Sequence, residues 1–226
     1  PAPERVGAGR ILAKLGDLRP GVGLRDDGLP DILWCEVPAG PFLMGSADED
    51  PWAYADEKPQ HTYAIAAPYA ISRYPITNAQ FSAFVEAGGY HRERYWSERG
   101  WAWRGREEIV GPSEFGGPWN LTNHPRVGVN WYEAMAFCRW LTDRLRERGG
   151  LAEDQEITLP TEPQWEKAAR GKDGRRFAWG PDPDPNRANY SDLGVDTTSA
   201  VGTFPGGISP YGLADANGNV WEWTCS

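Results

Sequence analysis

The sequence contains few cysteines and few histidines, and both shortages exclude classes of site. Its three cysteines are an odd number at wide spacing, namely Cys35, Cys138 and Cys225. No Cys-x-x-Cys pair occurs, so the spacing favours reduced thiols and excludes a disulfide framework and a cysteine zinc site. The three histidines lie far apart and have no partner at metal-ligand spacing. We therefore expect neither a zinc centre nor a catalytic triad.

Long apolar runs are also missing, and basic residues are outnumbered. No stretch approaches the roughly 18 to 20 apolar residues that span a bilayer, and the first residues, Pro-Ala-Pro-Glu, show no signal-peptide pattern. We expect a cytoplasmic protein without a membrane partner. Lys and Arg number 23 against 32 Asp and Glu, and the net charge of −9 repels a phosphate backbone. Nucleic acid is therefore excluded as a partner.

Aromatic residues and turn formers are abundant. The 226 residues include 12 Trp, 9 Tyr and 7 Phe, so aromatic side chains must supply much of the core. Gly and Pro contribute 27 and 20 residues, which are spread along the chain. This composition indicates a single loop-rich globular domain rather than two large ones.

Residues 1–30 differ in pattern from the rest. Apolar residues recur on one face of a short helix over residues 5–15, and residues 17–30 are rich in Gly, Pro and Asp without sustained periodicity. A lone helix of this length is marginal in water. We expect residues 1–30 to be a helix and linker that end a preceding domain or form a strap across the domain that begins at residue 31.

From residue 31 the pattern predicts short strands and three helices. Leu33, Cys35 and Val37 alternate with other residues before a Pro-Ala-Gly-Pro turn, which is a hairpin signal that places Cys35 in the core. Cys138 falls on the apolar stripe of a predicted helix and is also expected in the core. Each of the three helices begins with a capping signal, at Thr77, Asn130 and Thr161.

Residues 89–125 form a long segment without a stable period. It contains four tryptophans among Arg and Glu, namely Trp96, Trp101, Trp103 and Trp119. Trp and Arg dominate binding hot spots, so the segment is one candidate ligand-binding platform. The alternative is a surface loop that packs on its own indoles, and we favour this alternative.

Two acidic, amide-rich segments offer the oxygen ligands that a hard cation prefers. Residues 215–222 (Asp-Ala-Asn-Gly-Asn-Val-Trp-Glu) place two carboxylates around a glycine turn, and Asn189, Asp192 and Asp196 form a second cluster. Asp, Asn and Gly are also the ordinary residues of turns. Composition alone therefore leaves both the cation site and the simple turn open.

Five groups of residues, in order along residues 31–226, carry a family resemblance. They are Pro38–Ser46, Tyr74–Asn78, Val127–Ala134, Leu159–Gly171, and Tyr211–Leu213 with Gly218–Trp223. The chain resembles the sulfatase-modifying factor family, whose founding member is the formylglycine-generating enzyme. The resemblance implies an irregular α+β fold, a variant of the C-type lectin fold, with about three helices around short twisted strands. It also implies that residues 31–226 lack the C-terminal segment of that fold.

The resemblance implies structural calcium, because members of the family commonly bind it. The matching positions of one site are Asn189, the carbonyl of Tyr190 and Asp196. The matching positions of the other are Asp215, the carbonyls of Gly218 and Val220, and Glu222.

Catalytic residues of the family are not carried over by the resemblance. In the oxidase members, paired cysteines beyond the Trp-Glu-Trp motif bind copper and convert a substrate cysteine to formylglycine. Cys225 precedes the place of those cysteines, so copper is expected only if a following segment carries the pair. Related sulfoxide-forming enzymes of thiohistidine synthesis hold iron on a separate helical domain. The printed sequence therefore points away from an enzyme.

Two functions remain open at this stage. The first is a non-catalytic scaffold that binds or displays a protein or peptide ligand. Sensor domains of multidomain proteins and variable proteins of diversity-generating retroelements are examples within the family. The second is a copper-dependent formylglycine-generating oxidase that acts on a cysteine in a protein substrate and lacks its catalytic segment here. We favour the first by analogy.

Overall fold

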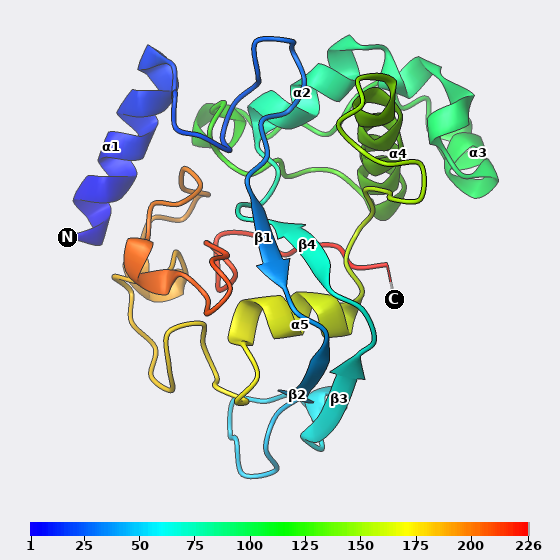
Figure 1. Ribbon diagram of the computed structural model, residues 1–226. Coiled ribbons are helices and arrows are strands. Elements are labelled where there is room, and N and C mark those ends of the chain that lie inside the picture. Colours follow the sequence, from blue (N-terminus) through cyan, green and yellow to red (C-terminus); the bar gives the residue numbers. More distant parts are fainter. Residues whose placement is uncertain (226) are drawn as a thin grey trace.

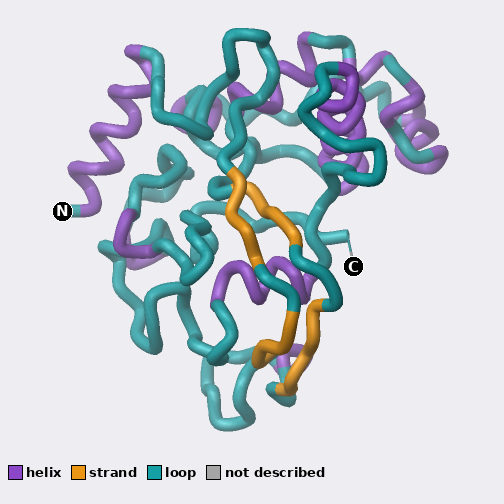
Figure 2. The backbone as a smooth tube through the Cα atoms, viewed as in Figure 1, coloured by secondary structure: helices purple, strands orange, loops and turns teal. Residues whose placement is uncertain are grey.

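Five α-helices, four short strands and six short 3₁₀ helices make up the regular structure of residues 1–225, which the computed structural model describes (Figure 1). The helices are α1 (Ala2–Leu15), α2 (Asn78–Glu86), α3 (Glu98–Arg106), α4 (Trp131–Glu147) and α5 (Glu162–Arg170). The strands are β1 (Trp34–Val37), β2 (Gly40–Met44), β3 (His61–Ile65) and β4 (Tyr69–Ser72). Loops and turns connect them over most of the chain (Figure 2). The predicted α+β class is confirmed.

The strands form two separate antiparallel pairs, β1 with β4 and β2 with β3. The hairpin predicted across the Pro-Ala-Gly-Pro turn is therefore wrong, because β1 and β2 do not pair with each other. Lys167 of α5 donates from Nζ to the carbonyl oxygens of Pro38 and Gly40, at 2.6 and 2.9 Å. These bonds hold the β1–β2 connection against α5, and β3 and β4 supply the partner strands.

Three helices begin at capping boxes, as the sequence predicts. In each box the N-cap side chain accepts from the N–H of the third helical residue, whose side chain accepts from the N-cap N–H. The pairs are Thr77 with Gln80, Asn130 with Glu133, and Thr161 with Gln164. None of the described helices is long and apolar enough to cross a bilayer.

The main core lies between α2 and α4 and consists largely of aromatic rings. Phe81 stacks on Phe137 with ring centroids 5.3 Å apart, and Phe84 lies 5.8 Å from Trp140. Cys138 packs in this cluster, whereas Cys35 packs in a second cluster with α5 and residues 211–216. Both cysteines are buried, as predicted.

The N-terminal segment lies along the side of the molecule (Figure 1). Ala2 and Val6 of α1 pack against Phe204. Residues 17–30, which follow α1, also contribute to the interior, because Thr77 Oγ1 donates to the carbonyl oxygen of the buried Val22 at 2.7 Å. Residues 1–30 are therefore held against the rest of the domain by apolar contacts and by hydrogen bonds.

Residues 89–125 contain a helix that the sequence does not predict. The Ser97 side chain caps α3 by accepting from the Gly100 N–H at 3.1 Å. Just before α3, Tyr95 and Trp96 are 0% and 5% exposed and belong to the main core. The interpretation as a self-packed surface loop is wrong for Tyr95, whose ring contacts Phe84 of α2 and whose hydroxyl accepts from Arg144 of α4. Trp96 is buried but contacts Tyr90 and Trp101 within the segment itself.

Candidate ligand-binding site

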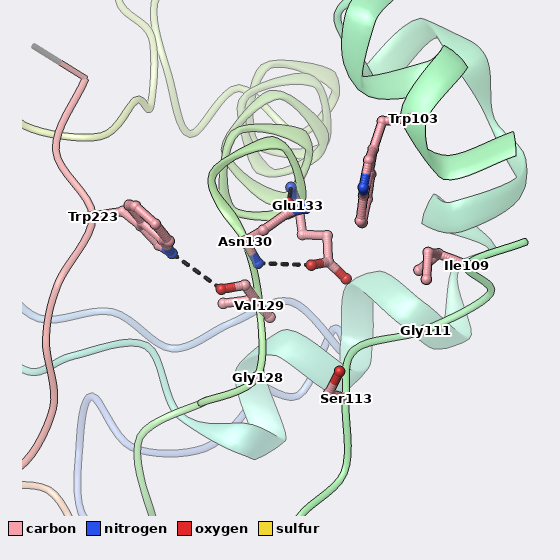
Figure 3. Close-up of a pocket in the computed structure, with 9 residues that line it drawn as sticks. All are labelled: Trp103, Ile109, Gly111, Ser113, Gly128, Val129, Asn130, Glu133 and Trp223. Atoms are coloured by element: carbon pink, nitrogen blue, oxygen red, sulfur yellow. Dashed lines mark hydrogen bonds between the residues drawn. The ribbon is translucent and has the colours of Figure 1, made fainter. Parts of the chain in front are cut away.

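A cavity of about 280 Å³ lies between α3, the start of α4 and the C-terminal segment. Figure 3 shows its lining, with Trp103 and Trp223 on opposite sides of the first turn of α4. The nine lining residues are Trp103, Ile109, Gly111, Ser113, Gly128, Val129, Asn130, Glu133 and Trp223. The cavity therefore combines two indoles with a carboxyl group contributed by a third part of the chain.

Glu133 is fixed on the cavity wall by its role in the capping box. The Glu133 N–H donates to Asn130 Oδ1 at 3.0 Å, and the Asn130 N–H donates to Glu133 Oε2 at 2.7 Å. The other carboxylate oxygen, Oε1, accepts from the Tyr90 hydroxyl at 2.6 Å. Burial raises the pKa of Glu133, which is 4% exposed, while these donors and Arg126 oppose that rise. The carboxyl is thus held rigidly in a desolvated position.

Trp223 is positioned by hydrogen bonds between the C-terminal segment and α4. Its indole N–H donates to the Val129 carbonyl at 3.0 Å, and the Trp131 indole N–H donates to the Thr224 carbonyl at 2.9 Å. The Cys225 N–H donates to the Pro160 carbonyl at 2.9 Å. The last described residues therefore form one wall of the cavity.

The structure separates the four tryptophans that the sequence suggests as ligand contacts. Trp103 lines the cavity, with its ring 6.0 Å from that of Tyr132. Trp96 is in the core and donates to the Gly89 carbonyl at 3.0 Å, so it is not available to a ligand. The other two pack locally: Trp101 against Trp96 and Arg104, and Trp119 against Phe115.

Sequence reasoning missed two cavity residues. Glu133 was predicted as a cap, and its proximity to the cavity depends on α3, which the sequence does not reveal. Trp223 enters the sequence argument only as the end of the Gly218–Trp223 motif, and the structure leaves it 49% exposed and in no strand. The capping box itself was the one signal that placed Glu133 at the start of a helix.

Asp215 and Glu222 are predicted as calcium ligands, and the charge of Asp215 acts on the carboxyl of Glu222. Asp215 is 7% exposed, accepts from the Gly202 N–H at 2.6 Å, and has its pKa raised to about 6 by burial. Glu222 is exposed as a residue. Desolvation of its carboxyl raises its pKa, a hydrogen bond from Trp165 opposes that rise, and the Asp215 charge adds to it. Two desolvated carboxyls with mutual repulsion fit a hard cation.

The two predicted calcium segments lie side by side. The Asn219 N–H donates to the Asn189 carbonyl at 2.7 Å, and a Cβ on Gly218 would stand 2.4 Å from that oxygen. Gly218 has φ of 87°, so both its conformation and this close approach require glycine. Its carbonyl accepts from the Val220 N–H at 2.9 Å. The remaining predicted ligands are on the Asn189 loop, namely half-buried Tyr190 and exposed Asp196. Calcium binding stays a prediction.

The cysteines do not fit a thiolate copper site. Burial raises the pKa of Cys35 and raises that of Cys138 to about 12, so both remain thiols, whereas metal ligation requires thiolates. Cys225 is exposed. Within residues 1–225, no group of three or more His, Cys, Asp and Glu side chains is arranged to hold a metal ion. We therefore assign no chemistry to copper on these thiols.

The fold and the cavity define an α+β domain with little regular structure, built around an aromatic-lined site. The family model of the sulfatase-modifying factor enzyme 1-like domain matches residues 30–226. The chain belongs to this family, and the resemblance carried by its motifs is confirmed.

Several relatives and solved structures share this domain. The hercynine oxygenase of Mycolicibacterium smegmatis is 34% identical, over 93% of this chain and 51% of its own length. The formylglycine-generating enzyme of Thermomonospora curvata is also 34% identical, over 83% of this chain and 69% of its own length. The structure of PvdO from Pseudomonas aeruginosa superposes with a TM-score of 0.65 at 25% identity, covering 92% of this chain and 75% of PvdO.

These relatives correct the expectation that the chain is not an enzyme. Three hercynine oxygenases and three formylglycine-generating enzymes match it at 30 to 35% identity. All six are named as enzymes, so the inclination toward a non-enzyme is wrong. The chain spans about half the length of the hercynine oxygenases that it matches.

Proposed function

We propose that this domain is the substrate-binding part of an enzyme that uses molecular oxygen, and that the cavity between Trp103 and Trp223 receives the substrate. The cavity carries the proposal, because it is concave, lined by aromatic rings and contains a buried carboxyl. The similarity to oxygenases named for hercynine supports the reaction class. The expected display of a ligand without catalysis finds no support among these relatives.

Substrate binding is assigned to this domain and oxygen activation to other parts of the protein. Within residues 1–225 no three or more His, Cys, Asp and Glu side chains are grouped to hold a metal ion, and we assign oxygen activation to groups outside that range. The domain binds and orients the substrate, and the indoles exclude water from it. A loss of cavity contacts should therefore raise KM more than it lowers kcat.

Oxygen uptake by the full-length protein from its native gene tests the proposal. We expect uptake with hercynine after loading with Fe(II), or with a cysteine-containing peptide after loading with Cu(I). Trp103→Ala should raise KM about tenfold, the equivalent of about 1.4 kcal/mol of lost contact. Trp119→Ala serves as the matched control, because Trp119 packs on Phe115 and does not line the cavity.

Two outcomes would contradict the proposal. One is a folded, metal-loaded protein that consumes oxygen at the same rate with and without both substrates. The other is substrate-dependent uptake with identical KM values for the Trp103 and Trp119 variants, which would place the substrate elsewhere.

A further inference from the structure

We propose that the β2–β3 loop (residues 45–60) is a docking surface for an arginine-rich segment of a partner protein, which stacks on Trp52 and Tyr54 and pairs with nearby carboxylates. The loop lies at the end of the molecule opposite α2, α3 and α4 (Figure 1). The surface is therefore separate from the cavity, and the inference does not depend on the proposed function.

The β2–β3 loop exposes two large aromatic rings within three residues. Trp52 is 80% exposed and Tyr54 is 71% exposed. Within residues 1–225 neither ring takes part in a ring–ring or cation–π contact, whereas Trp101 and Trp103 both contact other rings. Aromatic side chains supply much of the binding energy when a partner covers them. Two uncovered rings this close together indicate an interaction surface.

Hydrogen bonds and an ion pair hold the β2–β3 loop in one shape. The Asp50 carboxylate accepts from the Trp52 N–H at 2.9 Å and pairs with the Arg176 guanidinium through two bonds, of 2.9 and 2.8 Å. Lys58 Nζ donates to the carbonyl oxygens of Asp48 and Asp50, at 2.9 and 3.0 Å. The rings are therefore presented on a preorganised support, which lowers the entropic cost of binding.

The charge of the loop supplies the second argument. Four exposed carboxylates of the loop belong to no ion pair within the described residues. They are Asp48, Glu49, Asp56 and Glu57. The fifth carboxylate, Asp50, is paired with Arg176, and Lys58 is the one basic residue of the loop. Five carboxylates against one lysine and one arginine leave the surface with a net charge of −3.

Exposed rings among unpaired carboxylates match arginine side chains. A guanidinium stacks on an indole or phenol face and also donates to carboxylates through its planar fork. A lysine ammonium supplies the charge without the stacking plane. The negative charge of the loop repels the phosphates of nucleic acids and of anionic lipids. An arginine-rich peptide segment is therefore the occupant that fits both the rings and the charge.

Fluorescence anisotropy of a labelled hexa-arginine peptide, titrated with the native full-length protein, tests the inference. Physiological ionic strength screens long-range attraction to the acidic protein as a whole. We expect saturable binding that is about fivefold tighter than the binding of hexalysine. No saturable binding, or equal affinities for the two peptides, would overturn the inference.

Removal of one ring places the peptide on the loop. Trp52→Ala should weaken binding of hexa-arginine about tenfold and leave the thermal midpoint unchanged, because the ring is exposed. Trp221→Ala is the matched control, since Trp221 is 98% exposed and lies on the C-terminal segment. It should leave the affinity unchanged. Undiminished binding in Trp52→Ala, or equal losses in the two variants, would overturn the inference.

Removal of charge gives a test that leaves both rings in place and that also decides the matter if Trp52→Ala does not fold. The double variant Glu49→Gln, Asp56→Asn should bind hexa-arginine about tenfold more weakly and with a smaller dependence on salt. Its control is Glu4→Gln, Asp26→Asn, which removes two exposed carboxylates from the N-terminal segment. Equal losses in the two double variants would show that the peptide responds only to overall charge, and would overturn the inference.

A second copy of this chain is the other possible occupant. Analytical ultracentrifugation of the native protein distinguishes the two, because a monomer is expected without the peptide. Self-association that Trp52→Ala abolishes would assign the surface to a second copy and overturn the inference. The KM for substrate should be the same in Trp52→Ala and in the wild type, so the inference and the proposed function are tested separately.

Discussion

Outside the cavity, burial has a marked effect on the protonation of His124. It is 0% exposed, and its Nδ1 lies 2.9 Å from Thr198 Oγ1. Burial, with a smaller contribution from the Arg10 charge, lowers its pKa to about 4. The spacing of the histidines excluded a metal role from the sequence, but it gave no indication that this imidazole is kept neutral.

This lowered pKa makes the protein less stable in acid. In the unfolded chain His124 has a pKa near 6.5, whereas in the folded chain its pKa is about 4. Between these pH values the unfolded chain therefore binds a proton at His124 that the folded chain does not bind. The protonation of His124 therefore leaves the free energy of unfolding unchanged above pH 6.5 and lowers it as the pH drops toward 4. At pH 4.5 the loss amounts to about 2.5 kcal/mol.

Urea unfolding of the wild type and of His124→Asn at pH 7.5 and 4.5 measures this contribution. We expect the variant to be less stable at pH 7.5 but to lose about 2.5 kcal/mol less between the two pH values. Since the carboxyl groups titrate equally in both proteins, the difference isolates the imidazole. Parallel losses in the two proteins would contradict the assignment.

At the scale of elements, local signals predicted some helices and missed another. The capping boxes of α2, α4 and α5 depend on contacts between residues three positions apart, so the sequence is sufficient to place them. α3 has the sequence Glu-Arg-Gly-Trp-Ala-Trp-Arg-Gly-Arg, which lacks an apolar stripe and contains two glycines. Its helical state depends on the Ser97 cap and on packing of the segment against the core.

Deletion of residues 91–119 should therefore abolish cooperative unfolding. The deletion removes Tyr95 and Trp96, two core side chains at 0% and 5% exposure, and opens a large cavity beside Phe84. Phe115→Ala, at a position 61% exposed, is the control and should change stability by less than about 0.5 kcal/mol. A cooperative thermal transition in the deletion variant would show that the segment is separable after all.

At the scale of the whole molecule, two distant segments meet at the predicted calcium sites. Residues 189–199 and 215–222 are joined by the Asn219–Asn189 backbone hydrogen bond and by the close approach at Gly218. Desolvation raises the pKa of Glu222, and repulsion from the Asp215 charge adds to that rise. A cation bound there would relieve this repulsion and link both segments.

We expect calcium to raise the thermal midpoint by an amount that grows with its concentration, and Glu222→Ala to abolish that rise. Asp26→Ala, an exposed acidic position on the N-terminal segment, should leave the rise intact. Calorimetric scans with excess calcium and with a chelator provide the measurement. Equal thermal midpoints in the two conditions would contradict the prediction that this domain binds calcium.

The sequence by itself determined the α+β class, the family, the capped helices and the burial of Cys35 and Cys138. These features depend on motifs and on contacts within one turn of helix, which the order of residues specifies directly. Tertiary structure alone decided that β1 pairs with β4, that Trp96 is core while Trp103 lines a cavity, and that His124 stays neutral. Each of these depends on side chains far apart in the chain that meet only when the core closes and water is excluded.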